Sequence, residues 1–278
     1  MTTVSHALPR AGAWRRLGQR ALYWLPAVVV FALGIAAWQW LLPDVLHIQS
    51  FLLPRFSAVM STFWNERDTL WSKGSSAAWI TFKDALAGFG LGSSFAVLTA
   101  LALARWRPLG TALMPYMVAA NAIPIIAFAP ITSAWFGPLS PWPNIVIAAV
   151  LCYFPVAVNT LRGLTSVHPE SIELMHSYAA SQTDIFRRVR IPTSLPFVFT
   201  ALKVASVLAM IGAVVADYFG GSTTALGALI QNSVALARYE TAWAAILVAS
   251  ILGIAFYATI AIVERFVLRW HPSAGRVE

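Results

Sequence analysis

The stretch ELMHSYAASQTDIFRRVRIPTSLP, Glu173 to Pro196, is the longest strongly polar segment beyond residue 80 of this chain. The sequence around it is apolar: 59% of all residues are hydrophobic, 11% are charged, and the mean hydropathy is +0.70. These values lie well outside the usage of soluble proteins. The chain is therefore predicted to be a membrane protein whose polar stretch stands in water between spans.

The apolar stretches predict an all-α membrane protein with about six transmembrane helices. Stretches of about 20 residues, enough to cross a bilayer, begin near Ala21, Ala85, Thr111, Asn144, Phe197 and Thr241. The first, Ala21 to Leu42, is too long for a signal-peptide core and has no small-residue cleavage site after it, so we expect an anchor. The lone Cys152 falls in the fourth span, which excludes an intramolecular disulfide.

The basic residues predict the orientation of these spans. They neither gather on one face nor alternate with exposed aromatic residues, so the net charge of +8 does not indicate a nucleic-acid partner. With the N-terminus inside, thirteen fall in inner segments: Arg10, Arg15, Arg16, Arg20, Arg105, Arg107, Arg162, Arg187, Arg188, Arg190, Arg265, Arg269 and Arg276. Four fall in outer segments: Arg55, Arg67, Lys73 and Arg238. The positive-inside rule therefore places both termini and the polar stretch in the cytoplasm.

One membrane domain accounts for the whole chain. We expect a basic tail at 1–20, the anchor at 21–42, an external segment at 43–80, a core at 81–270 and a tail at 271–278. In the external segment, FSAVMSTFWNERDTLW has apolar residues at helical spacing and Ser57 as a possible N-cap, which predicts an amphipathic helix. The segment GGSTTALGALIQNSVALARYE predicts a short helix dipping towards the bilayer after a glycine turn.

The third span departs from a plain lipid-facing helix. It contains Pro115, Asn121, Pro124 and Pro130, and each proline removes a backbone donor and frees a carbonyl. Broken backbone survives at membrane depth only where protein or a water-filled cavity satisfies it. A kinked helix packed against its neighbours and a helix that lines a solute pathway are both open.

Two charged residues fall in the fifth span. Asp217 lies near its outer end, where a wetted helix end and a pathway role are both possible, and Lys203 is expected to reach the inner interface. In the second span, Gly88 and Gly92 have the GxxxG spacing that lets helix backbones approach closely, which predicts helix packing.

Enzyme chemistry finds little support. None of the three lysines follows a glycine, so a GxxxxGK phosphate loop is impossible and the chain cannot be its own ATPase. The five histidines are scattered, with no HExxH motif and no zinc-ligand spacing, so no metal is expected. A GxSxG elbow and a paired intramembrane carboxylate are also missing. We therefore expect a chain that is no enzyme and holds no cofactor of its own.

The polar stretch itself predicts two short helices. Pro169 suits a first helical position, with Glu170 and Glu173 in the opening turn. Ser181 and Asp184 restart the pattern as a variant capping box, and Pro192 is expected to end the second helix. Each helix has an apolar stripe, formed by Ile172, Met175 and Ala179 in the first and by Ile185, Phe186 and Val189 in the second. The stripes can pack beneath the chain's own spans or bind a partner.

This segment resembles the EAA loop of ABC importer permeases, in which Glu-Ala-Ala and a glycine precede Ile-x-Leu-Pro. Glu173 matches the glutamate, Ala179 the glycine position, and Val189 to Pro192 the close. Similarity extends from about residue 53 to 270, through LLPRFSAVM, NAIPIIAFAPI and GAVVADYFGG, and points to the nitrate, sulfonate, taurine and thiamine-precursor pyrimidine subfamily. Ala179 departs from the pattern, because the usual glycine often supplies a left-handed turn, which costs alanine about 1 kcal/mol.

The resemblance implies a type I transmembrane domain of the bacterial inner (plasma) membrane that passes a small polar or anionic solute. Two copies of a separate ATPase would hold ATP and Mg and dock on the loop at about 166–196, and an extracytoplasmic solute-binding protein would deliver the solute. A homodimer is the economical way to enclose a pathway. The expected coupling residues are Glu173, Ser177, Ala179, Ser181, Phe186, Arg187, Arg188 and Pro192. The candidate pathway residues are Asn121, Pro124 and Asp217.

The alternative is a secondary transporter or channel that needs no ATPase. The sequence argues against it, because ion-coupling carboxylates and inverted repeats are missing.

Overall fold

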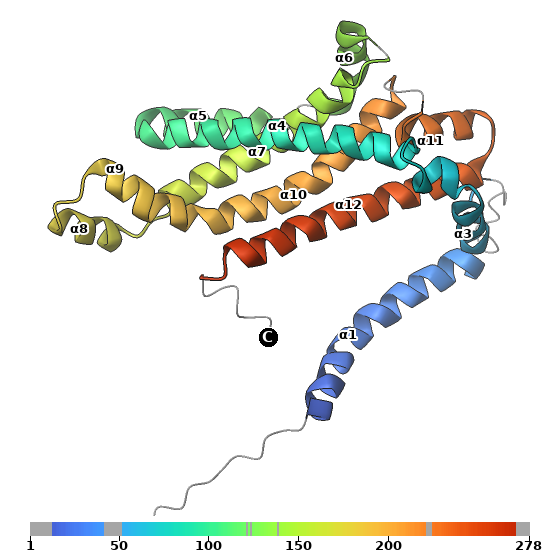
Figure 1. Cartoon of the computed structure of the whole chain (residues 1–278), viewed down its shortest axis with the longest axis horizontal. Coiled ribbons are helices and arrows are strands. Elements are labelled where there is room, and N and C mark those ends of the chain that lie inside the picture. The colour runs from blue at the N-terminus through green and yellow to red at the C-terminus, as the bar shows by residue number, and fades with distance from the viewer. Residues whose placement is uncertain are drawn as a thin grey trace, which may run out of the picture. The chain divides into compact units, whose positions relative to one another are not determined.

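The computed structural model describes residues 13–41, 52–120, 122, 124–137, 139–220 and 224–270. Every regular element in these ranges is a helix. The chain divides into one unit that ends at Ser61 and a second that begins at Thr62 (Figure 1). The elements are α1 Ala13–Ala36, η1 Ala37–Leu41, α3 Phe56–Asn65, η2 Asp68–Ser72, α4 Ala77–Arg105, α5 Arg107–Ala120, η3 Ile125–Phe128, α6 Ala129–Phe136, α7 Trp142–Thr165, α8 Pro169–Ser177, α9 Gln182–Ile185, η4 Phe186–Arg190, α10 Ile191–Tyr218, α11 Leu226–Ala235 and α12 Tyr239–Val267.

In the first unit, the helix predicted as the anchor runs from α1 into η1, and its stretch Leu25–Leu41 is apolar. The end of this helix contacts the start of α3. The Gln39 Oε1 atom accepts a hydrogen bond from the backbone N–H of Ser57 at 2.9 Å, and Trp38 Nε1 donates to the Pro54 carbonyl at 3.1 Å. The predicted helix α3 is present, but the prediction of Ser57 as its N-cap is wrong. A free amide in the first turn of α3 is satisfied by Gln39 instead.

Among the described residues, four helical segments are long and apolar enough to cross a membrane: Asp68–Arg105, Trp142–Thr165, Gln182–Tyr218 and Tyr239–Val267. Two of them begin earlier than expected. The second predicted span was placed near Ala85, but α4 is already helical at Ala77. The fifth was placed near Phe197, but its helical run begins at Gln182.

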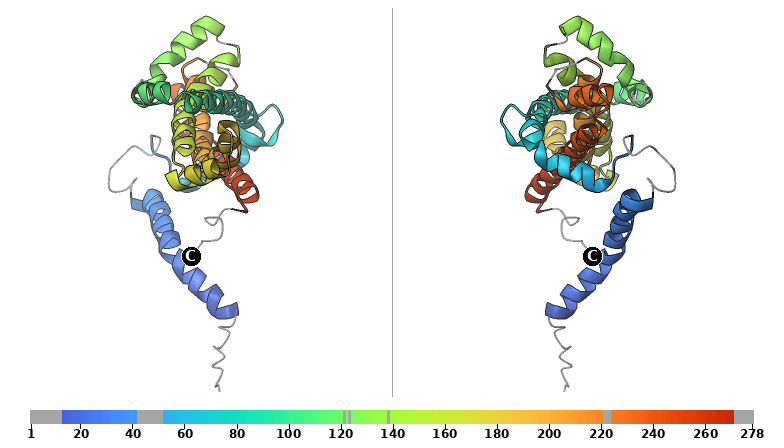
Figure 2. Two further views of the ribbon diagram at one scale, coloured as in Figure 1. Left: turned by 90° about the vertical axis from the view of Figure 1, so that its left-hand side faces the viewer. Right: turned by 90° about the vertical axis from the view of Figure 1, so that its right-hand side faces the viewer.

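The helices α4, α7 and α10 form the centre of the second unit, and α12 packs along α10 (Figure 1, Figure 2). Small residues allow the close approach of the central helices. A Cβ atom on Gly88 would collide with Ala148 of α7, and one on Gly92 would collide with the backbone of Ala149. On α10, a Cβ on Gly212 would lie 3.0 Å from the Ala148 Cα atom. The prediction that the GxxxG pair serves helix packing is therefore confirmed.

The third predicted span is not one helix. It consists of α5, a break, the short 3₁₀ helix η3, and α6. Pro115 lies inside α5, Pro124 lies in the break, and Pro130 lies in the first turn of α6, where its missing N–H costs nothing. The broken backbone that the prolines predicted is confirmed.

The short helix α11 is also confirmed, and it packs against α10 and α12. Of the two glycines expected to supply the turn, Gly220 has φ 130° just after α10, and Gly221 lies outside the described residues. Lys203, expected to reach the inner interface, forms an ion pair with a neighbouring helix, and its position at an interface stays a prediction. Its Nζ atom lies 2.7 Å from Glu264 Oε2 of α12, and each of the two side chains is 20% exposed. A charge at this depth is far less costly when it is paired.

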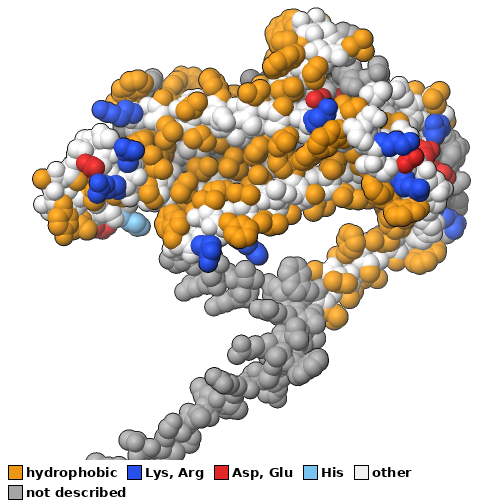
Figure 3. Space-filling model, viewed as in Figure 1, with side chains coloured by type: hydrophobic (Ala, Val, Ile, Leu, Met, Phe, Trp, Pro, Cys, Tyr) orange, Lys and Arg blue, Asp and Glu red, His pale blue; other side chains and the backbone are white. Residues whose placement is uncertain are grey.

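The surface over α10 and α12 is hydrophobic, whereas lysine and arginine side chains gather towards the ends of the second unit (Figure 3). Exposed apolar side chains on these two helices include Val204, Ile211, Ile251 and Ile254. This distribution is expected for helices that face lipid or another membrane chain, because the hydrocarbon core holds no water that could hydrogen-bond to polar side chains.

Candidate functional site

The loop between α7 and α10 has the two-helix form that its sequence predicted. Pro169 begins α8, which ends at Ser177, and α9 begins at Gln182 (Figure 1). Among the predicted coupling residues, Glu173 is exposed on α8, and the Ser177 hydroxyl donates to the Leu174 carbonyl at 2.7 Å.

Ala179 forms a left-handed turn between the two helices. Its φ is 53°, and the Ala180 N–H donates to the Met175 carbonyl at 3.0 Å, which closes α8 with a Schellman motif. Ala237 has φ 56° and closes α11 in the same way, with Arg238 N–H donating to the Ser233 carbonyl at 2.7 Å. The chain therefore keeps at Ala179 the geometry that glycine adopts readily, although alanine disfavours it.

Ser181 is the N-cap of α9, as predicted. Its Oγ atom accepts from the Asp184 N–H at 3.2 Å. The Asp184 carboxylate completes the predicted capping box: the Ser181 hydroxyl donates to Asp184 Oδ2 at 2.6 Å, and the backbone of Ser181 also bonds the carboxylate. Asp184 Oδ1 also lies 3.5 Å from Arg188 Nε, and both side chains are well exposed.

The apolar side chains of the loop divide into two groups. Ile185 is buried and Phe186 packs against the main core cluster, so the stripe of the second helix contacts the chain's own spans. By contrast, Leu174 on α8 is 58% exposed, and Tyr178, the C-cap residue of that helix four positions further on, is 77% exposed. The sequence reading missed both, although their i, i+4 spacing is visible in the sequence.

The prediction that Pro192 ends the second helix is wrong. The chain continues without interruption from Gln182 to Tyr218, and Pro192 lies in the first turn of α10. The π-helical segment η4 precedes it, with the Ile191 N–H bonded to the Phe186 carbonyl. This wider turn accommodates a proline inside the helical run. The π-helical segment η4 contains the exposed Arg187 and Arg188, so both side chains belong to the same continuous helical run as α10.

A second group of functional candidates is a buried polar cluster that joins four helices. Asn144 Nδ2 of α7 donates to Asp217 Oδ1 of α10 at 2.6 Å and to Asp84 Oδ2 of α4 at 2.9 Å. Thr81 Oγ1 of α4 donates to Asp217 Oδ2 at 3.0 Å and accepts from the first N–H of α11, that of Leu226, at 2.9 Å. None of the four side chains is more than 7% exposed.

This cluster corrects the expectation that paired carboxylates are missing from the membrane region. Asp84 and Asp217 accept from the same nitrogen atom, although they are far apart in the sequence. The expectation of a wetted helix end at Asp217 is also wrong for the single chain, since the side chain is 1% exposed. A pathway role for Asp217 stays a prediction. Pro124 is exposed at the break after α5, and Asn121 lies outside the described residues.

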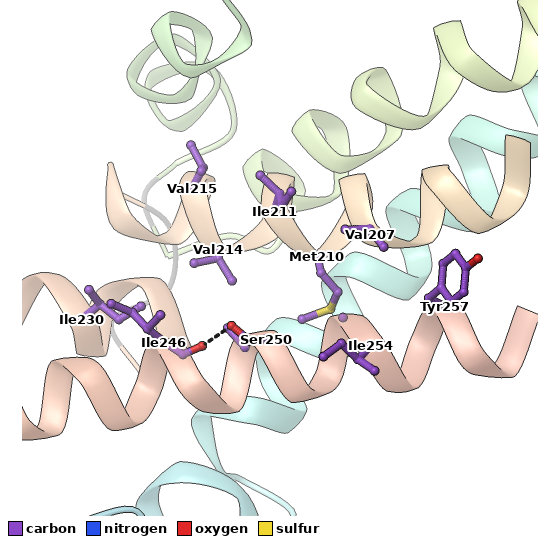
Figure 4. Close-up of a pocket in the computed structure, with 12 residues that line it drawn as sticks. Val207, Met210, Ile211, Val214, Val215, Ile230, Ile246, Ser250, Ile254 and Tyr257 are labelled. Atoms are coloured by element: carbon purple, nitrogen blue, oxygen red, sulfur yellow. Dashed lines mark hydrogen bonds between the residues drawn. The ribbon is translucent and has the colours of Figure 1, made fainter. Parts of the chain in front are cut away.

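A groove with a volume of about 450 Å³ lies between α10 and α12. Met210 of α10 points toward α12, and Ile254 and Tyr257 lie on the facing helix (Figure 4). The Ser250 hydroxyl is bonded within its own helix, to the Ile246 carbonyl at 2.9 Å. The groove is therefore apolar and offers a surface for packing more than a site for chemistry.

Comparison with known proteins agrees with this arrangement. A family model described as "binding-protein-dependent transport system inner membrane component" matches residues 89–269. The riboflavin transport system permease protein RibX of Chloroflexus aurantiacus is 30% identical over 226 residues, which are 81% of this chain and 82% of RibX. The formylaminopyrimidine transport permease protein ThiX of Halalkalibacterium halodurans is 35% identical over 57% of this chain and 63% of ThiX, less than two thirds of that protein.

A more distant relative covers more of the chain. The putative aliphatic sulfonates transport permease protein SsuC of Escherichia coli is 27% identical over 245 residues, 86% of this chain and 89% of SsuC. The matched residues 89–269 include α7, the loop with its left-handed turn, and α10. The chain thus belongs to the family of binding-protein-dependent transport system inner membrane components, the permeases of ABC transporters.

Proposed function

We propose that this chain is the membrane subunit of an ATP-driven importer and that α8 and the turn after it are the docking site for a separate ATPase. The observation that carries this is the exposed face of α8. Leu174 and Tyr178 leave large apolar surfaces in water beside the exposed carboxylate of Glu173. Tyrosine is enriched among the anchors of protein interfaces, and exposed apolar patches mark interaction sites.

Rigid attachment of the loop supports coupling. The second half of the loop is continuous with α10, and Ile185 and Phe186 pack into the transmembrane core. A displacement of the docked ATPase would therefore be transmitted to α10 without loss in a flexible joint. Domain rotation of this kind is a common way to switch between two states of an interface.

The remaining parts of the proposal follow from the relatives. Two ATPase copies, holding ATP and Mg, would bind two copies of this chain, and an extracytoplasmic binding protein would deliver the solute. The names of the relatives mention riboflavin, formylaminopyrimidine and aliphatic sulfonates, so we propose a small polar or anionic solute. Asn121, Pro124 and Asp217 would lie near the pathway between the two copies, and both termini would lie in the cytoplasm.

One observation favours the alternative of a gradient-driven transporter: the carboxylates of Asp84 and Asp217 lie at one site. Both carboxylates accept a hydrogen bond from Asn144, however, and so join three helices, which gives them a structural role.

Reconstitution distinguishes the two functions. Proteoliposomes that contain this chain, the ATPase subunit and the binding protein should take up solute only with internal ATP, and Glu173→Ala should abolish solute-stimulated ATP hydrolysis with normal insertion. Uptake driven by a proton or sodium gradient without ATP would contradict the proposal.

Orientation is tested separately, in a Cys152→Ser background. Single cysteines at Ser171, on exposed α8, and at Ser75, in the exposed turn before α4, should react with an impermeant thiol reagent from opposite sides of the membrane.

A further inference from the structure

A small basic cavity lies between the end of α4 and the second half of the loop. Its volume is about 250 Å³, and it is lined by Ala104, Arg105, Gln182, Thr183, Phe186 and Arg190. Two arginines and two uncharged polar side chains face this space, and no carboxylate is among its lining residues. Such a set of donors suits a phosphate group, which arginine binds through several N–H groups at once.

An apolar groove adjoins the basic cavity. It has a volume of about 850 Å³ and lies between α5 and the helices α4 and α7, with Met114, Val118 and Leu161 among its lining residues. Ala104 lines both spaces, so both reach the last turn of α4. A ligand that occupied both would need one anionic end and one long apolar part.

The position of the two spaces fits a lipid of one leaflet. Arg105 ends one membrane-length segment and Gln182 begins another. Trp106, next to Arg105, is 61% exposed, and tryptophan is enriched at the interface between headgroups and hydrocarbon. Arg105 makes no ion pair or side-chain hydrogen bond with the described part of the chain, so its charge is available to a ligand.

We infer that the two spaces together bind one anionic phospholipid, with its phosphate at Arg105 and Arg190 and an acyl chain in the groove beside Met114. With the orientation given under the proposed function, the site lies in the cytoplasmic leaflet. The inference depends on the proposed function for this orientation alone. A bound lipid would fill the space between α5 and the rest of the core and would contact the loop proposed to dock the ATPase.

The test measures lipid retention by the full chain purified from mixed vesicles of phosphatidylglycerol and phosphatidylcholine. Lipid that remains after detergent exchange is identified by mass spectrometry. The wild type should retain phosphatidylglycerol in preference to phosphatidylcholine. Arg105→Gln/Arg190→Gln should lose about tenfold or more of this preference, since each basic residue near an anionic headgroup contributes to binding. Arg265→Gln/Arg269→Gln, which removes two exposed charges from the end of α12, is the matched control and should behave as the wild type.

Three results would overturn the inference. Equal phosphatidylglycerol retention by the arginine variant and the control would show that the cavity binds no headgroup. Calorimetric binding of inorganic phosphate that is lost in the arginine variant, without any preference for phosphatidylglycerol, would assign the cavity to a soluble phosphate. Normal lipid retention with loss of ATPase association would assign the arginines to the ATPase. Because retention is measured without ATPase or solute, it can fail while the transport function holds.

Discussion

The loop between α7 and α10 and the polar cluster around Asn144 both place polar residues in a hydrophobic protein, but they do so in opposite ways. In the loop, hydrogen bonds join residues a few positions apart, and the apolar Leu174 and Tyr178 are left in water. In the cluster, hydrogen bonds join helices that are distant in sequence, and every polar side chain is buried. The first region is the proposed docking site for a partner, and the second joins helices of the chain to one another.

The largest expected effect tests the cluster. Asn144→Leu removes the one nitrogen atom that bonds both Asp84 and Asp217 and leaves two buried carboxyl groups without that donor. Breaking a buried charged network typically costs about 3 to 5 kcal/mol. We expect a large fall in the midpoint of thermal unfolding in detergent.

The matched control for this change is Asn159→Leu on the same helix. Asn159 is half-buried, and its Nδ2 atom donates to the Pro155 carbonyl of its own helix at 2.8 Å. Thr81→Val, which conserves shape, should lower the midpoint by a smaller amount through loss of the bonds to Asp217 and Leu226. If Asn144→Leu were as stable as the control, the cluster would not be what holds α4, α7 and α10 together.

The second effect tests the exposed face of α8. Leu174→Ser/Tyr178→Ser should weaken association with the ATPase by at least about tenfold, because central apolar anchors contribute roughly 2 kcal/mol or more each. Unfolding should be unchanged, since both side chains are largely exposed. Coelution with the ATPase subunit measures the effect. Leu236→Ser, at a residue 69% exposed after α11, is the control and should coelute normally.

The loop could be predicted from the sequence because its signals are local. Pro169 starts α8, Ser181 caps α9, and both act within one turn of where they stand. The all-helical membrane fold followed from composition and from the length of the apolar stretches. The helix boundaries did not follow, since α4 and the helical run before α10 continue beyond their apolar parts.

The cluster could not be predicted, because Asp84, Asn144 and Asp217 carry no local pattern and meet only when three helices pack. Close packing at Gly88 and Gly212 brings the helices together. The sequence of a single helix does not determine its register against its neighbours. The prediction that Pro192 ends a helix failed because it relied on a local pattern alone. A local rule ends a helix there, but the π-helical turn at Phe186–Arg190 overrides that rule.

A smaller effect tests the cost of the turn. Ala179→Gly should stabilise the loop by about 1 kcal/mol, because glycine adopts the left-handed conformation without the penalty that alanine incurs. The readout is hydrogen exchange at the Ala180 amide, which is bonded to the Met175 carbonyl and should become better protected. Ala180→Gly, at an ordinary φ, should give no such gain. Unchanged protection in Ala179→Gly would show that the turn is held by its surroundings.

The smallest effect contrasts two ion pairs. Arg188 Nε lies 3.5 Å from Asp184 Oδ1 with side chains 76% and 45% exposed, whereas Lys203 and Glu264 lie 2.7 Å apart and are 20% exposed. Exposed pairs contribute little to stability because water and salt screen them. Arg188→Gln should therefore leave the unfolding midpoint unchanged, while Lys203→Gln should lower it by leaving the largely buried carboxylate of Glu264 without its partner. If Arg188 attracts the ATPase electrostatically, Arg188→Gln should slow association with the ATPase most at low salt, where long-range attraction is least screened. A lowered midpoint in Arg188→Gln would instead make the loop part of the folded core, and the contrast between the two regions would fail.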